Sequence, residues 1–340
     1  MTSEVAIVGA GVSGLACARA LASAGHRPIV FERSRGVGGR CATRRIFDQP
    51  VDHGASFLHG VDEEFLVDAE AVDGAEILQG WPSNVAGDGP PCSPQAFRER
   101  ERRWAYASGV SVFPKTLARG LDIRLGTEVA AIGDERNGAT IIAAEGGRTR
   151  FSTVVLALPA ETARGLTEPH APGSRDLRSV TALLRLVGSQ SCLTAICGYP
   201  GGGSAPPWEV CYPADSASVQ MISHDSSKRR RARFTVLVIQ GKPCWSRVRL
   251  DDPESSWGAE LIAEAARIAG PWAAVPAWVQ FHRWRFARSD RGSELSRPVK
   301  VHLPGGGRLV VTGEAFAPGG GIEAAWTAGR AAARRVMEET

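Results

Sequence analysis

The chain has 340 residues, which is long for one domain and comfortable for two. Its 43% hydrophobic and 22% charged residues are typical of a globular protein, and a net charge of +4 is too weak to indicate nucleic-acid binding. No apolar run reaches 18 residues, so no membrane-spanning helix is expected. The first residues, MTSEVAIVGAG, lack the basic region and cleavage site of a signal peptide, and we expect a cytoplasmic protein.

The cysteines and the strongest charge run predict structural roles. The seven cysteines include no Cys-x-x-Cys pair, so we expect reduced, mostly buried thiols and no metal site. The run KRRRAR at 228–233 is short, and short charge runs are usually solvated. We therefore expect a surface loop there.

A strand, a glycine-rich turn and a helix open the chain. Val5–Val8 is a short apolar run that predicts a buried strand. The turn GAGVSG follows at residues 9–14, and the Ala/Leu-rich segment 15–24 predicts a helix. A second strand over Pro28–Phe31 ends at Glu32.

The order and spacing of these elements predict a dinucleotide site. Three glycines permit a tight turn, close approach of a pyrophosphate, and close packing of the helix on the strand. The helix N-terminus offers N–H groups and a partial positive charge to the phosphates. An acid at the end of the second strand accepts from a ribose hydroxyl and disfavours a 2′-phosphate. The candidate binding residues are Gly9, Gly11, Val12, Ser13, Gly14, Glu32 and Arg33.

A second glycine-rich stretch follows the ribose acid. It reads GVGGRCATRR at 36–45, and VDHGASFLHG follows at 51–60. NAD binding needs no such second turn, and together the two motifs resemble those of FAD-containing amine oxidases. In that family the first motif follows the pyrophosphate and ribityl chain, and the second lies along the flavin. The resemblance implies FAD as the cofactor, with contacts from Gly38, Gly39, Arg40, Asp52, His53, Gly54 and Ala55.

The next part predicts the small antiparallel sheet often inserted into such nucleotide domains. Its expected strands are Ile123–Leu125, Glu128–Ile132 and one that ends at Ala144. By resemblance, a backbone group near Val129 contacts the adenine. Ser152–Pro159 is apolar on both faces and predicts a central parallel strand. The charged segment Arg98–Tyr106 predicts a solvated helix.

From about residue 166 to 300 the pattern changes to short strands separated by loops. The expected strands are Leu183–Val187, Cys192–Cys197, Val219–Ser223 and Phe234–Gln240. A helix is expected from Trp257 to Ala269. The fold class is therefore α/β, with a Rossmann-like FAD-binding domain and a second α+β substrate domain built on an antiparallel sheet. We assign residues 1–60, 112–165 and 301–340 to the first domain, and 61–111 and 166–300 to the second.

The last segment returns to the nucleotide domain. Leu309–Thr312 predicts a strand, and Ile322–Val336 predicts a helix after a glycine-rich turn. The segment resembles the terminal motif of flavin amine oxidases, whose acid contacts the ribityl region and whose helix N-terminus holds the carbonyl edge of the flavin. The implied contacts are Gly313, Glu314, Gly321, Ile322 and Glu323. Covalently flavinylated relatives use a Cys here; none follows Cys244, so non-covalent FAD is expected.

Within that family the chain is most similar to the renalase-like proteins. It is short, and GGRCATRR occurs with DHGA. The motif SSK at 226–228 precedes an apolar strand and Trp245, and HRWRFA at 282–287 matches the His-Arg-Trp-Arg-aromatic-Ala segment of those proteins. The chain departs from them at Asp225, where relatives often have Asn, and at Arg229-Arg230, where they often have Pro-Gly.

This resemblance implies an oxidase of dihydronicotinamides. The expected substrates are the 2- or 6-dihydro isomers of NAD(P)H, which transfer hydride to flavin N5 while O2 is reduced to hydrogen peroxide. Because the product is an aromatic nicotinamide cation, the protein mainly has to position two rings. The candidate ring-facing residues are Phe57, His59, Asp225, Gln240, Trp284 and Phe316.

Three other functions stay open at this point. A flavin amine oxidase would usually have a lysine near N5, and Lys228 and Lys242 are the lysines closest to plausible ring-facing positions. A tailoring flavoenzyme acting on a secondary metabolite is the second alternative, and a flavin-binding protein without turnover is the third. The expected partners are a small-molecule substrate and O2, and the oligomeric state is open.

Overall fold

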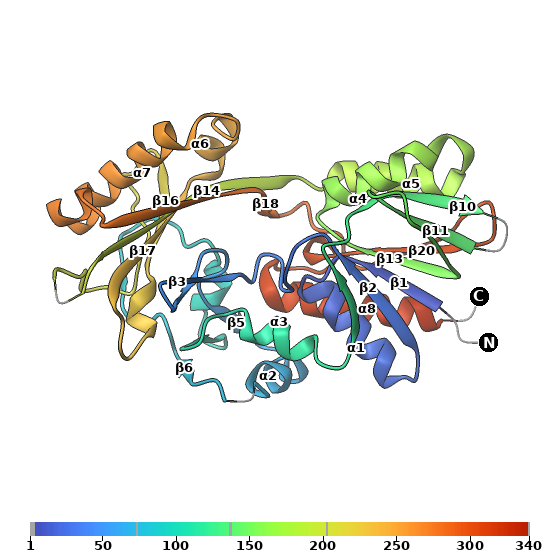
Figure 1. Cartoon of the computed structure of the whole chain (residues 1–340), viewed down its shortest axis with the longest axis horizontal. Helices are drawn as coiled ribbons and strands as arrows, with labels where there is room; N and C mark the ends of the chain where they lie inside the picture. Colours follow the sequence, from blue (N-terminus) through green and yellow to red (C-terminus); the bar gives the residue numbers. More distant parts are fainter. Residues whose placement is uncertain (1–3, 73, 136–137, 202, 339–340) are drawn as a thin grey trace. The chain divides into compact units, whose positions relative to one another are not determined.

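The computed structural model describes residues 4–72, 74–135, 138–201 and 203–338, and it divides into two compact units (Figure 1). Unit 1 comprises residues 1–39, 113–189 and 288–340. Unit 2 comprises residues 40–112 and 190–287. Each unit thus collects segments that are far apart in the sequence.

Unit 1 is built on a six-stranded, mostly parallel sheet with the strand order β19-β20-β13-β1-β2-β9. β19 is antiparallel to β20, and the other neighbours are parallel. All five residues of the central strand β13 are buried, as expected for a strand covered on both faces. The strands are β1 (Glu4–Val8), β2 (Arg27–Glu32), β9 (Asp122–Leu125), β13 (Thr153–Ala157), β19 (Val299–His302) and β20 (Arg308–Thr312).

Helices and a small sheet cover the two faces of this sheet. Helices α1 and α8 lie together on one side, and the three-stranded antiparallel sheet β10-β11-β12 lies on the other with α4 and α5 (Figure 1). Gly329 permits close contact of α8 with α1, because a Cβ there would lie 2.1 Å from the carbonyl oxygen of Ser13. The remaining elements are α1 (Val12–Ser23), α3 (Val112–Leu117), β10 (Val129–Glu135), β11 (Gly138–Ala143), β12 (Arg148–Phe151), α4 (Ala160–Thr167), α5 (Arg175–Leu186) and α8 (Gly321–Met337).

Unit 2 is built on a second six-stranded sheet with the order β18-β14-β17-β16-β15-β7. β14, β17, β16 and β15 pair antiparallel, and the short β7 pairs parallel to β15. The strands are β7 (Val85–Ala86), β14 (Ser189–Pro200), β15 (Val210–Cys211), β16 (Val219–His224), β17 (Phe234–Gly241) and β18 (Trp278–Ser289).

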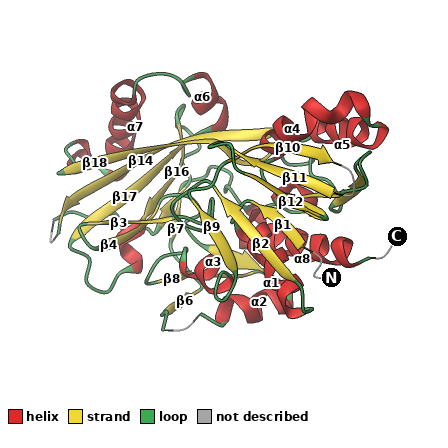
Figure 2. Ribbon diagram, turned by 45° about the vertical axis from the view of Figure 1, so that its right-hand side comes forward, coloured by secondary structure: helices red, strands yellow, loops and turns green. Residues whose placement is uncertain are grey.

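The two faces of this sheet are covered differently. Helices α6 (Pro243–Val248) and α7 (Glu254–Ala269) cover one face, where alternate residues of β14 and β17 form an apolar core with Trp257 and Leu261 (Figure 2). The hairpin β3–β4 contacts the other face through Ile46 and Val51. The small elements are β3 (Thr43–Ile46), β4 (Gln49–Asp52), β5 (Leu58–Gly60), α2 (Glu63–Glu70), β6 (Ile77–Gln79) and β8 (Arg102–Tyr106).

Two expected elements are wrong in type. The charged segment 98–106 was expected to be a helix, but its second half is strand β8, in which Trp104, Ala105 and Tyr106 are all buried. Aromatic residues favour strands with a half-buried surface. The strand preference of Trp104 and Tyr106 therefore decides the structure, although charged residues precede them. Leu183–Val187 was expected to be a strand, but Leu183–Leu186 are the end of α5, which buries Leu177, Val180, Thr181 and Leu184 at helical spacing.

The other segments expected to be strands or helices are confirmed in type, with ends that differ by a few residues. Ile123–Leu125, expected in the small antiparallel sheet, lies instead in β9 of the main sheet, where it pairs parallel to β2. Among the described residues, no helix is long and apolar enough to cross a membrane. The functional assignment of the two units to a FAD-binding and a substrate domain stays a prediction.

Candidate flavin site

The turn between β1 and α1 is closed by glycines. Gly9 has a φ of +103°, and a Cβ on it would lie 2.5 Å from the carbonyl oxygen of Ala157. A Cβ on Gly14 would lie 1.9 Å from the carbonyl oxygen of Gly9. By contrast, a Cβ on Gly11 would meet no protein atom within 4 Å. Gly9 and Gly14 are therefore required by packing, whereas Gly11 faces open space that a ligand can fill.

The N-terminus of α1 fits a pyrophosphate. The helix follows Gly11, and no side chain caps it. The first N–H groups of a helix have no partner within the helix. In the described part of the chain, the Oγ of Ser13 is buried without a hydrogen-bond partner. A phosphate oxygen at this turn would accept from the backbone N–H groups and from the Ser13 hydroxyl. This fits the predicted binding residues Val12, Ser13 and Gly14.

Glu32 is held at the end of β2 by two backbone groups. Its Oε2 accepts from the Ala10 N–H and its Oε1 from the Ser34 N–H, each at 2.8 Å. The carboxylate therefore lies beside the glycine-rich turn, and each oxygen keeps a further lone pair for a ribose hydroxyl. Arg33, the next residue, is exposed.

The second glycine-rich stretch packs on the first. Gly38 donates its N–H to the carbonyl of Ala10 at 2.8 Å and forms a bridge with Gly11. Gly39 has a φ of +56°, and a Cβ on it would lie 3.4 Å from the Cα of Gly11. The glycines Gly38 and Gly39 of the second motif therefore lie against the first motif in unit 1.

The C-terminal motif joins the same unit. Glu314 follows β20, is buried, and accepts from the N–H of Gly321 at 3.1 Å and from that of Ser289 at 3.3 Å. Its carboxylate thus adjoins the N-terminus of α8, where Ile322 and Glu323 form the first turn. Gly313, with a φ of +149°, precedes Glu314. Val129 begins β10 and packs against the core of unit 1.

In unit 2, the segment 53–55 packs against Arg40 and Trp284. Ala55 donates its N–H to the carbonyl of Arg40 at 3.0 Å. A Cβ on Gly54 would lie 2.1 Å from that carbonyl oxygen and 3.2 Å from the Trp284 ring. Only glycine fits at this position, so the packing of the segment explains why the DHGA motif has a glycine there.

Two of the ring-facing candidates hold this segment directly. The Trp284 ring stacks on His53, with centroids 5.5 Å apart and planes at 29°, and its Nε1 donates to the His53 carbonyl at 3.1 Å. Gln240 donates from its amide to the Gly54 carbonyl at 2.8 Å. The structure therefore brings Gln240 and Trp284 to the residues expected along the flavin.

The two histidines of this region are neutral at neutral pH. Burial lowers the pKa of His53 to about 3, and the nearby cation Arg44 adds to the effect. Burial and Arg44 also lower the pKa of His282 to about 4. The His53 and His282 rings lie edge to face, 5.1 Å apart, and Arg44 contacts the Nδ1 of His282 at 2.9 Å. Within the described residues, the Nδ1 of His53 is buried without a hydrogen-bond partner.

Phe57 and His59 make other contacts in unit 2. The Phe57 ring lies 6.0 Å from that of Trp81 and 6.3 Å from that of Phe97. His59 contacts Glu101 through Nδ1 at 3.2 Å. Phe316 lies in unit 1, where it is 1% exposed within the main apolar core.

Asp225 lies in a buried ion cluster that the sequence analysis did not predict. Its carboxylate contacts Lys228 and Arg229, and the same two cations contact Asp52. The expectation of a solvated KRRRAR loop is wrong for Lys228, which is 1% exposed. A signal was present in the sequence, because Asp225 precedes the two cations by three and four residues, a spacing that one turn of helix brings together.

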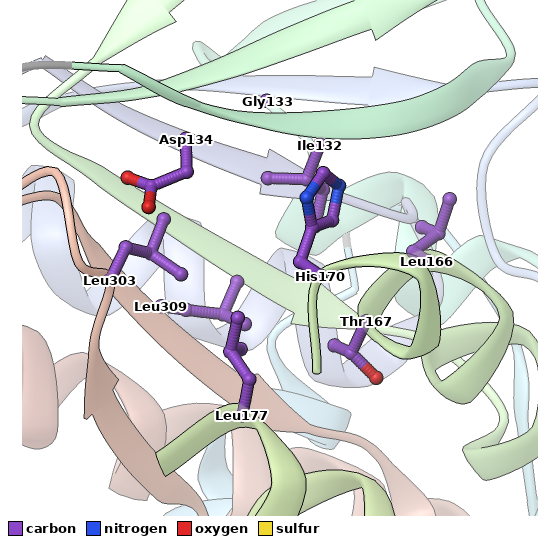
Figure 3. Close-up of a pocket in the computed structure, with 9 residues that line it drawn as sticks. All are labelled: Ile132, Gly133, Asp134, Leu166, Thr167, His170, Leu177, Leu303 and Leu309. Carbon is purple, nitrogen blue, oxygen red and sulfur yellow. The ribbon is translucent and has the colours of Figure 1, made fainter. Parts of the chain in front are cut away.

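A separate small pocket lies in unit 1, between β10 and the segment around His170 (Figure 3). Its volume is about 10 Å³, which is enough for about one water molecule and far too small for a flavin. None of the predicted site residues lines it.

The comparisons with known proteins agree with this geometry. A family model described as flavin containing amine oxidoreductase matches residues 81–337, and one described as an NAD(P)-binding Rossmann-like domain matches residues 7–68. Polyamine oxidase 4 of Oryza sativa subsp. japonica is 48% identical over 61 residues, which are 18% of this chain and only 12% of that protein.

Two solved structures share the fold over 99% of both chains. They are a putrescine oxidase, with a TM-score of 0.71 and 16% identity, and the cyclohexylamine oxidase of Brevibacterium oxydans IH-35A, with a TM-score of 0.70 and 15% identity. The glycine-rich turns, the unpaired Ser13 hydroxyl and the two acids fit the FAD that this family binds. The chain belongs to the flavin-containing amine oxidoreductase family, and FAD is the cofactor that this family implies.

Proposed function

We propose that this protein is a renalase-like oxidase that binds FAD non-covalently and oxidises the 2- or 6-dihydro isomers of NAD(P)H. In this proposal unit 1 is the FAD-binding domain and unit 2 is the substrate domain. The other reactant is O2, and the protein acts in the cytoplasm. The bound flavin supplies the two-electron acceptor, which takes a hydride and returns both electrons to O2.

Four uncharged side chains around segment 53–55, in a region that also holds the cation Arg44, carry this proposal. His53 and His282 are neutral at neutral pH, and Gln240 and Trp284 carry no charge. A dihydronicotinamide that loses hydride becomes an aromatic cation, and it needs no protein base. Neutral aromatic and amide groups can orient such a ring without repelling the cation that forms.

The positions of the two candidate lysines also support it. Lys228 is fully buried and contacts Asp52 and Asp225, each at 2.5 Å. Lys242 donates to the carbonyl of Ser216. Neither lysine lies in a motif typical of the lysine near N5 in flavin amine oxidases, and both ammonium groups are bound to other protein atoms.

The balanced reaction provides the test. One dihydronicotinamide, one O2 and one proton should give one oxidised nicotinamide and one hydrogen peroxide. We would supply 6-dihydro NADH to the aerobic holoprotein and measure oxygen uptake, peroxide and NAD⁺ together. A 1:1:1 ratio with turnover supports the proposal, and no uptake with either the 2- or the 6-isomer would contradict it.

A flavin amine oxidase is the second candidate, and the family assignment favours it. The relatives that the chain matches include a polyamine oxidase, and its structural neighbours include two amine oxidases. An aerobic assay with putrescine, a longer polyamine and a cyclic monoamine would separate the two functions. Peroxide formation with an amine but with no dihydronicotinamide isomer would establish this alternative.

A further inference from the structure

Four charged side chains form a buried cluster in unit 2 that hydride transfer does not use. They are Asp52, Asp225, Lys228 and Arg229. The Nζ of Lys228 lies 2.5 Å from a carboxylate oxygen of each acid, and the side chains of all three residues are 0% exposed. Arg229 contacts both carboxylates at 3.2 Å. Two acids and two bases leave the cluster without net charge, as buried ions require.

The cluster is anchored in the surrounding strands and loops. Arg229 donates to the carbonyls of Pro50 and Tyr106. The Oδ1 of Asp52 accepts from the Thr43 hydroxyl at 2.6 Å and from the Val110 N–H at 2.9 Å. Burial alone would raise the pKa of Asp52, but Lys228 and Arg229 lower it below its ordinary value, so Asp52 is ionised.

Lys228 holds both ends of one short segment. Its Nζ contacts the Asp52 carboxylate and also donates to the carbonyl of Ser56 at 3.0 Å. With Asp225 as the third partner, all three donors of the ammonium group are used. The residues between the two contacts are His53, Gly54 and Ala55, which the sequence places along the flavin.

The middle of the segment is held separately. Trp284 donates to the His53 carbonyl, Gln240 donates to the Gly54 carbonyl, and Ala55 donates to the carbonyl of Arg40. Each of these bonds holds a single residue of the segment. Lys228 instead contacts both Asp52 and Ser56, and so sets the distance between the two ends of the segment. Loss of Lys228 would remove one contact at each end at once. Asp52 would keep its contacts with Arg229, Thr43 and the Val110 N–H, and the bonds in the middle would remain.

We propose that Lys228 is a positioning residue of the flavin site, which holds Asp52 and the Ser56 carbonyl so that His53, Gly54 and Ala55 keep the conformation that contacts the cofactor. This inference rests on the proposed function only in taking residues 53–55 as flavin contacts, and it does not depend on the substrate.

The test compares three variants of the full chain. Lys228→Met removes both end contacts, while Asp225→Asn keeps them and retains an oxygen that can accept from Asp52 N–H. Arg230→Met is the surface control, because Arg230 is 82% exposed and pairs with Glu76. Hydrogen exchange of a peptide covering 50–58 is measured in the apoprotein, and the visible circular dichroism of bound flavin is measured in the holoprotein.

We expect Lys228→Met to speed exchange in the 50–58 peptide at least tenfold, with no change in α7, and to alter the flavin dichroism. Arg230→Met should keep wild-type exchange and dichroism, and Asp225→Asn should change both less than Lys228→Met because it keeps both end contacts. Wild-type exchange and dichroism in folded Lys228→Met protein would overturn the proposal, as would equal effects of Asp225→Asn.

Lys228→Met leaves an excess of buried negative charge and can prevent folding. The double variant Asp225→Asn with Lys228→Met removes one charge of each sign and leaves Asp52 paired with Arg229. It should fold and should show the same faster exchange at 50–58. If the double variant folds with wild-type exchange there, Lys228 is only a stabilising residue. Neither readout involves substrate, so a wrong substrate assignment would not affect the outcome.

Discussion

The carboxylate of Glu32 accepts a hydrogen bond from the backbone N–H of Ala10 at 2.8 Å, across 22 residues of chain. The bond ties the end of β2 to the glycine-rich turn after β1. A ribose acid and a phosphate turn are thereby held at a fixed separation before any nucleotide binds.

Replacement of Glu32 by Ala should weaken FAD binding. The carboxylate holds the turn and, in our proposal, also accepts from the cofactor ribose. A hydrogen bond to a charged group contributes about 1.5–3 kcal/mol. We expect the Kd for FAD to rise by about 10- to 100-fold in titrations of apoprotein. Arg19→Ala, on the exposed side of α1, is the control and should bind FAD like the wild type. Full flavin occupancy of the Glu32 variant at dilute protein would show that the assignment of the nucleotide site is wrong.

Two glycines of the first turn should respond differently to alanine. A Cβ on Gly14 would clash with the Gly9 carbonyl, so Gly14→Ala should destabilise the apoprotein by about 1–3 kcal/mol. A Cβ on Gly11 meets no protein atom within 4 Å, so Gly11→Ala should change apoprotein stability by less than about 1 kcal/mol and still weaken FAD binding. Urea unfolding and flavin titration measure the two effects. Normal FAD affinity in Gly11→Ala would place the pyrophosphate elsewhere.

The buried histidine His53 should make the apoprotein less stable in mild acid. Its pKa is about 3 when folded, against 6.5 for an ordinary histidine side chain, so below pH 6.5 the unfolded chain binds more protons. The free energy of unfolding should therefore fall as the pH drops from 6.5 towards 4, by at most about 1.4 kcal/mol per pH unit for this residue. His53→Gln should flatten the dependence. His282 acts in the same direction, with less effect because it is more exposed. An unchanged slope in His53→Gln would contradict this account.

Acid precipitation should release the flavin. No cysteine follows Cys244, so the terminal motif offers no thiol for a covalent bond. We expect all of the yellow colour in the supernatant after trichloroacetic acid treatment of the holoprotein. Colour retained in the protein pellet would show covalent attachment.

Much of unit 1 could be predicted from the sequence because its determinants are local. Gly9, Gly11 and Gly14 lie within one turn, and Glu32 ends the next strand, so spacing alone indicates the site. The family resemblance placed Gly38 beside the cofactor, but its contact with Ala10 was not predicted. Such motifs constrain the backbone directly, and little depends on distant residues.

The cluster around Lys228 could not be predicted in the same way. Asp52 and Lys228 are 176 positions apart, and nothing in the local pattern links them. A run of basic residues is usually solvated, and only the burial of Asp52 and Asp225 makes the interior favourable for two of its cations. The strand β8 and the end of α5 were mispredicted for a similar reason, because tertiary burial decided their structure.

The most direct test of the proposed function is the flavin absorbance of the holoprotein under anaerobic conditions. The 2- and 6-dihydro isomers of NADH, ordinary 4-dihydro NADH and a panel of amines would be added to separate samples. We predict rapid bleaching of the absorbance of oxidised flavin by a 2- or 6-isomer, with little effect of the other reductants. Bleaching by an amine alone would contradict the renalase-like function and establish an amine oxidase.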